Sequence, residues 1–179
     1  MTKNEMYVAE AKEMMKEFFS NRSCSKRVLA TLNYHKNINE NGIVDGEFHS
    51  GCFRTVYVPS SRPFVIKTAI RKSGNAQCER EANTYADAVE QGFSRYFAKF
   101  YGSFTFRRHT FYVFQKVANT GEFLFNHYDD LMSDYAYKKG LKNFMDDHDI
   151  NDLHGGNFGK IGRTYVLTDY AGCYCDDWD

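Results

Sequence analysis

Residues 152–172 read DLHGGNFGKIGRTYVLTDYAG and contain the most informative spacing in the chain. Asp152 and Asn157 stand five positions apart in a glycine-containing stretch, and Asp169 follows twelve positions after Asn157. Alternating apolar residues on the two sides of Gly162 predict a short hairpin between Asn157 and Asp169. The pattern therefore places a carboxylate and a carboxamide before this hairpin and a second carboxylate after it.

These oxygen-bearing side chains suit phosphoryl transfer from ATP. Such transfer needs Mg²⁺ ions that bridge the phosphates, ligands for those ions, and a carboxylate that accepts or orients the proton of the acceptor hydroxyl. Asp and Asn oxygens are hard ligands of the kind that Mg²⁺ prefers. An Asx-turn or a cap would account for Asp152 and Asn157, but it gives no reason for Asp169 at this separation.

A lysine interrupts an apolar stretch earlier in the chain, at Phe64-Val65-Ile66-Lys67. Burial of an ammonium is costly unless an anion pairs with it, so phosphate oxygens or a helical glutamate are the expected partners. The predicted helix that follows carries Glu79 and Glu81. Glu81 is favoured because it directly precedes the apolar side of that helix, which includes Ala82 and Tyr85. The alternative for Lys67 is a sheet-edge residue with a solvated ammonium.

The remaining sequence follows an α+β pattern. Helical spacing of apolar residues predicts helices at residues 4–19, 75–89 and 122–145, the last broken at Gly140. Strand signals are found at residues 43–44, 52–57, 64–70, 96–106 and 110–117, with turns at 46–51, 59–63 and Arg107-Arg108-His109. This order predicts an antiparallel sheet with one inserted helix, followed by a helical part that ends in the short hairpin.

Five parts in this order resemble the protein-kinase superfamily: a glycine-loop strand pair, Val65-Ile66-Lys67, a helical Glu, Asp152-x-x-x-x-Asn157 and Asp169-x-x-Gly172. The resemblance spans residues 43–172. Within the superfamily, the chain is most similar to the short serine/threonine protein kinases of bacteriophages. The form Asp-Leu-His-x-Gly-Asn is also similar to that of aminoglycoside and related small-molecule kinases.

The resemblance implies a protein-kinase-like two-lobe fold. Residues 1–42 would form a helical extension, and residues 43–117 an N-lobe with an antiparallel sheet and one helix. Residues 118–179 would form a minimal helical C-lobe that lacks the activation segment and the later helices of ordinary kinases. Because those later parts bind peptide substrate in ordinary kinases, the class of acceptor stays open.

The resemblance also implies a role for each candidate residue. Lys67 would contact the α- and β-phosphates of ATP, and Glu81 would hold Lys67. Asp152 would be the catalytic carboxylate, Asn157 a metal ligand, and Asp169 the principal ligand of Mg²⁺.

The loop over the phosphates departs from the family pattern. Gly51 matches one of its three usual glycines, with Phe53 as a cap, whereas His49 and Arg54 occupy the other two positions. Fewer backbone amides can then approach the phosphates closely, which weakens the case for tight nucleotide binding.

The expected function is that of an ATP- and Mg²⁺-dependent phosphotransferase, a small serine/threonine protein kinase that acts on proteins (host proteins if the chain is phage-encoded). The alternatives are a pseudokinase-like binding or inhibitor protein and a small-molecule kinase. No run of about 18 uncharged apolar residues is present, and the amino terminus lacks an apolar leader, so a cytoplasmic protein without a membrane partner is expected. The oligomeric state is left open.

Charge and metal-binding motifs raise further alternatives. Residues 1–120 hold 18 Lys or Arg against 11 Asp or Glu, and residues 121–179 hold 5 against 12. The imbalance reflects either two solvated faces or a cationic half that faces an anionic half across a cleft. Nucleic-acid binding is disfavoured because the basic residues form no stripe. A zinc site from His148, His154, Cys173 and Cys175 has unsuitable spacing, and residues 146–152 lack the glycine and glutamate of a calcium loop.

Overall fold

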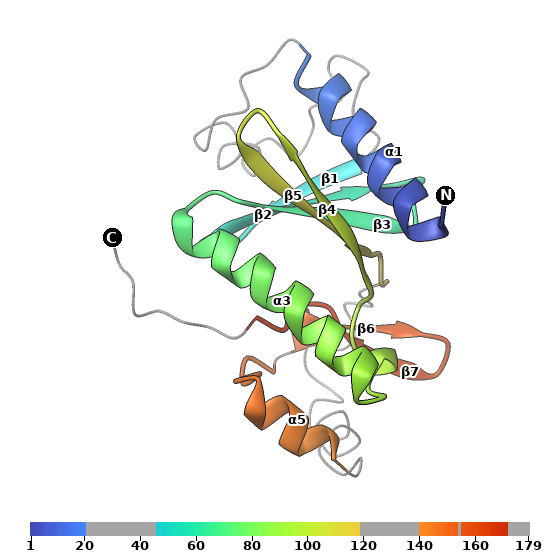
Figure 1. Cartoon of the computed structure of the whole chain (residues 1–179), viewed down its shortest axis with the longest axis vertical. Coiled ribbons are helices and arrows are strands. Elements are labelled where there is room, and N and C mark those ends of the chain that lie inside the picture. The colour runs from blue at the N-terminus through green and yellow to red at the C-terminus, as the bar shows by residue number, and fades with distance from the viewer. Residues whose placement is uncertain (21–45, 119–139, 154, 172–179) are drawn as a thin grey trace. The chain divides into compact units, whose positions relative to one another are not determined.

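A computed structural model describes residues 1–20, 46–118, 140–153 and 155–171 of the chain (Figure 1). Within these ranges, three α-helices and two antiparallel sheets confirm the predicted α+β class. The helices are α1 (Lys3–Phe18), α3 (Lys72–Glu90) and α5 (Leu141–Asp147), with 3₁₀ turns η2 (Ser94–Tyr96) and η4 (Gly155–Asn157). The strands are β1 (Gly46–Ser50), β2 (Arg54–Pro59), β3 (Phe64–Ala69), β4 (Phe100–Phe106), β5 (His109–Gln115), β6 (Phe158–Ile161) and β7 (Thr164–Leu167).

The chain divides into two compact units. The first unit comprises Met1–Glu79 and Phe100–Lys116, and the second comprises Arg80–Lys99 and Val117–Asp179. The first unit holds α1 and a five-stranded sheet of order β1-β2-β3-β5-β4. The second holds the hairpin β6–β7 and helix α5. The division falls within helix α3, after Glu79.

Helix α1 forms where the apolar spacing predicts it. A capping box closes its first turn, since the backbone N–H of Thr2 donates to Glu5 and that of Glu5 donates to the Thr2 hydroxyl. One face of the helix is buried and packs on the sheet with Phe64, Ile66, Phe104 and Phe111; its buried residues are Tyr7, Ala11, Met15 and Phe18. The predicted helix at 4–19 is confirmed with a shift of one residue at each end.

The register of the sheet decides which way the Lys67 side chain points. Lys67 pairs with Val56 on β2 and with Tyr112 on β5. Its neighbours Ile66 and Thr68 lie on the face that α1 covers, so alternation along β3 directs Lys67 to the opposite face. The predicted strand at 64–70 is confirmed to within one residue, and its two faces have different surroundings.

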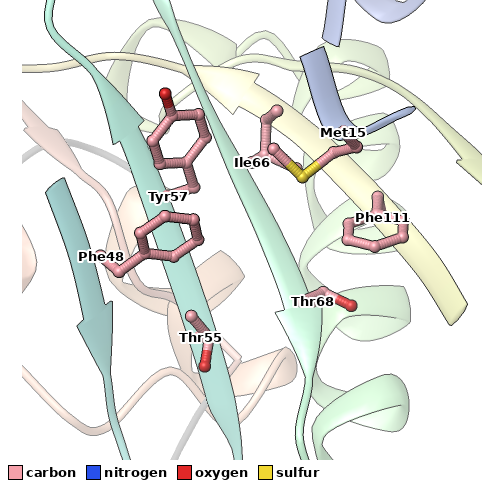
Figure 2. A pocket seen from close by; sticks show the side chains of 7 residues that line it. All are labelled: Met15, Phe48, Thr55, Tyr57, Ile66, Thr68 and Phe111. Carbon is pink, nitrogen blue, oxygen red and sulfur yellow. The ribbon is translucent and has the colours of Figure 1, made fainter. Parts of the chain in front are cut away.

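A small apolar pocket lies on the α1 side of this sheet (Figure 2). Its empty volume is about 190 Å³, part of which is open to solvent. It is lined by Met15, Phe48, Thr55, Tyr57, Ile66, Thr68 and Phe111. Because Ile66 and Thr68 point into it, this pocket is on the wrong face of β3 to receive a ligand of Lys67.

Most predicted boundaries of the described helices and strands shift by one to three residues, and two are wrong by four residues or more. Residues 46–50 were expected in a turn but form strand β1, where Phe48 stacks on Tyr57 of β2 with ring centroids 4.6 Å apart. The strand expected from residue 96 begins only at Phe100, because residues 94–96 form a 3₁₀ turn. Strand β1 forms by pairing with β2 across a short turn, and the 3₁₀ turn delays the start of β4; the local alternation of apolar residues predicts neither.

Other predicted features fall partly or wholly outside the described residues. Strand signals at 43–44 and the boundary at 42/43 lie outside them, as does the start of the predicted helix at 122–145. The end of that helix corresponds to α5, which begins at Leu141 after Gly140 at φ 85°; the part before Gly140 lies outside the described residues, so the predicted break is not tested. Among the described residues, no helix is both long and apolar enough to cross a membrane.

The turn between β4 and β5 has an unusual composition. Its two central residues, Arg107 and Arg108, have φ angles of 49° and 68°. In the other short hairpin, β6–β7, glycine (Gly162, φ 61°) takes such a position. The left-handed conformation costs a residue with a Cβ about 1–2 kcal/mol, so the Arg-Arg turn is strained where Asn-Gly would not be.

Candidate active site

Asn157 connects the two loops of the second unit that carry the predicted phosphotransfer residues. Its side-chain Nδ2 donates to the backbone carbonyl of Asp152 at 2.8 Å. Its own backbone carbonyl accepts from both the N–H of Thr168, at 2.6 Å, and the Thr168 hydroxyl, at 2.9 Å. These bonds tie the Asp152 loop to the residue that precedes Asp169. The structure thus brings the segments of Asp152, Asn157 and Asp169 together, as the hairpin prediction requires.

The segment that follows Asp169 is anchored by a buried carboxylate. The backbone N–H of Tyr170 donates to Glu81 Oε1 at 3.2 Å, and the Glu81 side chain is fully buried. The Tyr170 hydroxyl donates to the carbonyl of Ala98 at 2.8 Å, and Arg80 donates to the carbonyl of Ala171 at 3.1 Å. Three bonds therefore fix the backbone just beyond Asp169 to helix α3 and to the stretch that leads into β4.

The donor chemistry of Asp152, Asn157 and Asp169 suits a magnesium ion. Asn157 is 8% exposed, and the bond from its Nδ2 to Asp152 identifies the other end of the amide as the oxygen. Asp152 and Asp169 are half-buried, so a ligand can approach them. A carboxamide oxygen and two carboxylates form the hard donor set that Mg²⁺ takes, usually with waters and phosphates as further ligands. Within the described part of the chain, no group of three or more His, Cys, Asp or Glu could hold a metal.

The zinc and calcium alternatives involve other residues. His154, Cys173 and Cys175 lie outside the described residues, so the zinc alternative concerns a part of the chain that the structure does not describe. Asp146, Asp147 and Asp149 are exposed at the end of α5, as expected for a solvated acidic turn.

Lys67 is buried in the first unit. Its side chain is 4% exposed, and its Nζ lies 4.7 Å from the centroid of the Phe114 ring. The face of an aromatic ring attracts a cation, and it does so more strongly where water is excluded. Lys67 is therefore not a sheet-edge residue with a solvated ammonium, and that alternative is wrong: β3 lies between β2 and β5.

The two candidate glutamates of helix α3 differ in environment. Glu81 is fully buried, whereas Glu79 is exposed and accepts a hydrogen bond from the Tyr112 hydroxyl at 3.3 Å. Burial raises the pKa of Tyr112 well above its ordinary value, and the Glu79 carboxylate and the Cys78 thiol raise it further. Tyr112 stands beside Lys67 in the sheet, so the neutral phenol joins α3 to the strand next to the candidate lysine.

Tyr112→Phe gives a test of this environment. At pH 7 the variant loses one hydrogen bond and is expected to be about 1 kcal/mol less stable. Below pH 10 the Tyr112 phenol is neutral in both states and adds no pH dependence. Above pH 10 the unfolded chain releases this proton while the folded chain keeps it. The stability of the parent then falls relative to the variant by up to about 1.4 kcal/mol per pH unit. Urea unfolding at pH 9, 10 and 11 measures the difference, and parallel trends would contradict it.

The predicted phosphate loop lies between β1 and β2. Gly51 is exposed, and its N–H donates to the carbonyl of Arg54 at 2.9 Å. The carbonyl of Phe53 accepts from the N–H groups of Ile70 and Arg71, at 2.9 and 3.3 Å. The loop backbone is therefore fastened to the residues that follow β3.

Gly74→Ala is expected to destabilise the first unit by about 1–3 kcal/mol. In an ordinary helix this change stabilises, because alanine is the better helix former. Here a Cβ on Gly74 would lie 2.2 Å from the carbonyl oxygen of Phe53 and 3.1 Å from the Ala69 Cβ. Denaturant unfolding measures the sign of the change. Ala76→Gly, at an exposed position of the same helix, is the matched control and should cost up to about 1 kcal/mol.

Several residues that position the site were not predicted. Thr168 and Tyr170 fix the two sides of Asp169, and Phe114 lies against Lys67. The positions of Thr168 and Tyr170 next to Asp169 in the sequence could have identified them as residues that position the site. No local signal marks Phe114, because it is 47 residues from Lys67 in sequence and meets it only through the pairing of β3 with β5.

No protein-family model matches the chain, and no curated protein sequence matches it.

Proposed function

We propose that the chain is an ATP- and Mg²⁺-dependent phosphotransferase with a protein-kinase-like two-lobe fold. The observation that carries the proposal is the double role of Asn157, whose side chain bonds the Asp152 loop and whose backbone bonds Thr168 beside Asp169. A turn or a cap needs only the first of these links, and the second continues the pairing of β6 with β7. A phosphotransfer site needs both, because its carboxylates must be held in fixed positions before the nucleotide arrives.

Each residue of the second unit has a defined task in this proposal. Asp152 accepts or orients the proton of the acceptor hydroxyl, which increases the nucleophilicity of that oxygen. Asn157 and Asp169 hold Mg²⁺, which neutralises phosphate charge when it is bound. The buried Glu81 fixes the backbone of Tyr170 and thereby restricts the motion of Asp169.

In the first unit, Lys67 is assigned to the α- and β-phosphates of ATP. A buried ammonium over the Phe114 ring is constrained in position and partly desolvated, which strengthens its attraction for an anion. Gly51 and Phe53 belong to the loop that covers the phosphates. The Phe53 backbone accepts two hydrogen bonds from the residues after β3, whereas the Gly51 N–H makes one bond within the loop.

The proposed acceptor is a serine or threonine hydroxyl of a protein, in the cytoplasm of the host if the chain is phage-encoded. The test uses the purified chain with labelled ATP, MgCl₂ and a cell lysate. Label on proteins, lost when EDTA is added, is expected. In parallel, ATP and Mg²⁺ at one hundred times the dissociation constant should stabilise the fold by about 2.7 kcal/mol. Absence of both the label and the stabilisation would reject the proposal. Label on small metabolites alone would reject the protein acceptor.

One observation favours a second candidate, a pseudokinase-like binding protein. The N–H of Gly51, the one family glycine in the loop, is engaged with Arg54, and Arg54 itself is 9% exposed. An amide that is used within the loop does not bind phosphate. If ATP gives no thermal shift and the biological effect survives Asp169→Ala, this second function replaces the first.

A further inference from the structure

The strained turn of hairpin β4–β5 has no role in the proposed phosphotransfer. Arg107 and Arg108 are both exposed, and both adopt positive φ angles, which Asn and Gly adopt at little cost. Such strain is commonly retained at functional positions, where the side chains do something that the favourable residues would not do. Compared with an Asn-Gly turn, this turn carries two adjacent guanidinium groups at the tip of the hairpin.

The tip extends beyond its neighbouring strand. The pairing of β5 with β3 ends at Phe111, whereas the pairing of β5 with β4 continues to His109. Arg107 is ordered by the adjacent ring, since its Cζ lies 5.2 Å from the centroid of Phe106. The two side chains are therefore presented on a supported projection of the sheet.

The charges carried by the neighbouring described segments are mainly positive. Because β3 and β5 are antiparallel, the end of β3 and the start of β5 share one end of the sheet, as does the β1–β2 turn. The described segments that reach this end, residues 49–54, 68–78 and 105–111, contain five Arg or Lys, of which Arg54 is buried, and no Asp or Glu, although Glu79 follows the second segment directly. On α1, which covers one face of the sheet, Glu13 is paired with Lys16 at 2.6 Å. We call Arg107 and Arg108 the basic tip.

The chemistry at the basic tip favours a protein over a nucleic acid. Single-stranded nucleic acids are bound by basic grooves with open aromatic rings on which bases stack. Here Phe104 and Phe111 are buried, and Phe106 lies under Arg107. The cations gather at one turn instead of following a track. Guanidinium groups also bind carboxylates in a bidentate manner, which requires no groove.

We propose that the basic tip is a docking surface for an acidic protein segment, rich in Asp and Glu. The interaction is electrostatic and is expected to weaken as salt rises from 50 to 300 mM, since screening shortens the range of such contacts.

The decisive variant is the double substitution Arg107→Asn with Arg108→Gly, which installs the favourable turn sequence. The melting temperature is expected to rise by about 4–8 °C because the strain is relieved. Affinity for the acidic segment is expected to fall at least about tenfold because both guanidinium groups are gone. A variant that is more stable yet binds less well separates docking from folding.

The measurement is fluorescence anisotropy with the full chain and no ATP. The probes are a labelled peptide of alternating Asp and Glu with Gly spacers, and a labelled oligothymidine of equal charge. Arg163→Gly, at the exposed Gly162-Arg163 turn of the other hairpin, is the matched charge control and should bind as the parent does. Arg107→Gln with Arg108→Gln is a second variant that should also lose binding.

Peptide binding that is unchanged in both double variants, or no peptide binding by the parent, would overturn the proposal. Preference for the oligothymidine would also overturn it and would indicate a nucleic-acid surface. Because the assay contains no nucleotide, its outcome is independent of whether the chain transfers phosphate.

Discussion

Asp169→Asn is expected to lower the rate of phosphoryl transfer by about 1,000-fold or more, while the fold is retained. The change replaces a charged oxygen by a neutral amide at the position assigned to the principal Mg²⁺ ligand. A thousandfold loss corresponds to about 4 kcal/mol of transition-state stabilisation, the size of effect that follows removal of one preorganised electrostatic group. The backbone bonds on both sides of Asp169, from Thr168 to Asn157 and from Tyr170 to Glu81, do not use the side chain that is changed.

The measurement is label transfer from ATP over a range of Mg²⁺ concentrations, with thermal melting to verify the fold. Asp147→Asn removes the same charge from an exposed position at the end of α5 and should leave transfer unchanged. Full activity of Asp169→Asn would remove this residue from the site. Equal losses in both variants would point to a general effect of charge instead of a ligand.

Phe97→Ala is expected to destabilise the second unit by about 3–5 kcal/mol, as is usual for loss of a buried phenylalanine. Phe97 is 2% exposed, and its ring lies 5.5 Å from that of Phe144 and 5.2 Å from that of Tyr170. Its backbone forms a parallel bridge with Leu167. Leu167 and Tyr170 lie close to Asp169 on either side. The cavity that Phe97→Ala leaves is therefore expected to loosen the Asp169 segment as well as the core.

Urea unfolding measures the loss of stability, and proteolysis under native conditions measures the local loosening. Phe97→Leu keeps most of the apolar volume and should cost clearly less. Phe93→Ala is the matched control; this ring also contacts Phe144, at 5.3 Å, but it is half-buried, so a smaller loss is expected. A cost for Phe97→Ala no greater than that for Phe93→Ala would contradict the central place assigned to Phe97.

Features that depend on neighbours in sequence were predicted well. The buried positions of α1 recur at helical spacing, so its existence and its buried face follow from the order of residues alone. The hairpin at residues 158–167 likewise follows from alternation around a glycine that has φ 61° in the structure. The spacing of Asp152, Asn157 and Asp169 around this hairpin allowed a candidate site to be named without coordinates.

Features that depend on close approach of distant segments were not predicted. Gly74 has the position of an ordinary helical residue, yet the carbonyl of Phe53 leaves no room for a Cβ there. The Asn157 bonds depend on where Thr168 arrives, and Phe114 meets Lys67 only through the pairing of β3 with β5. Sequence alone thus determined the repeating patterns and the order of chemical groups. Tertiary structure decided burial, hydrogen-bond partners and strain, because these depend on distances between residues that the chain order does not specify.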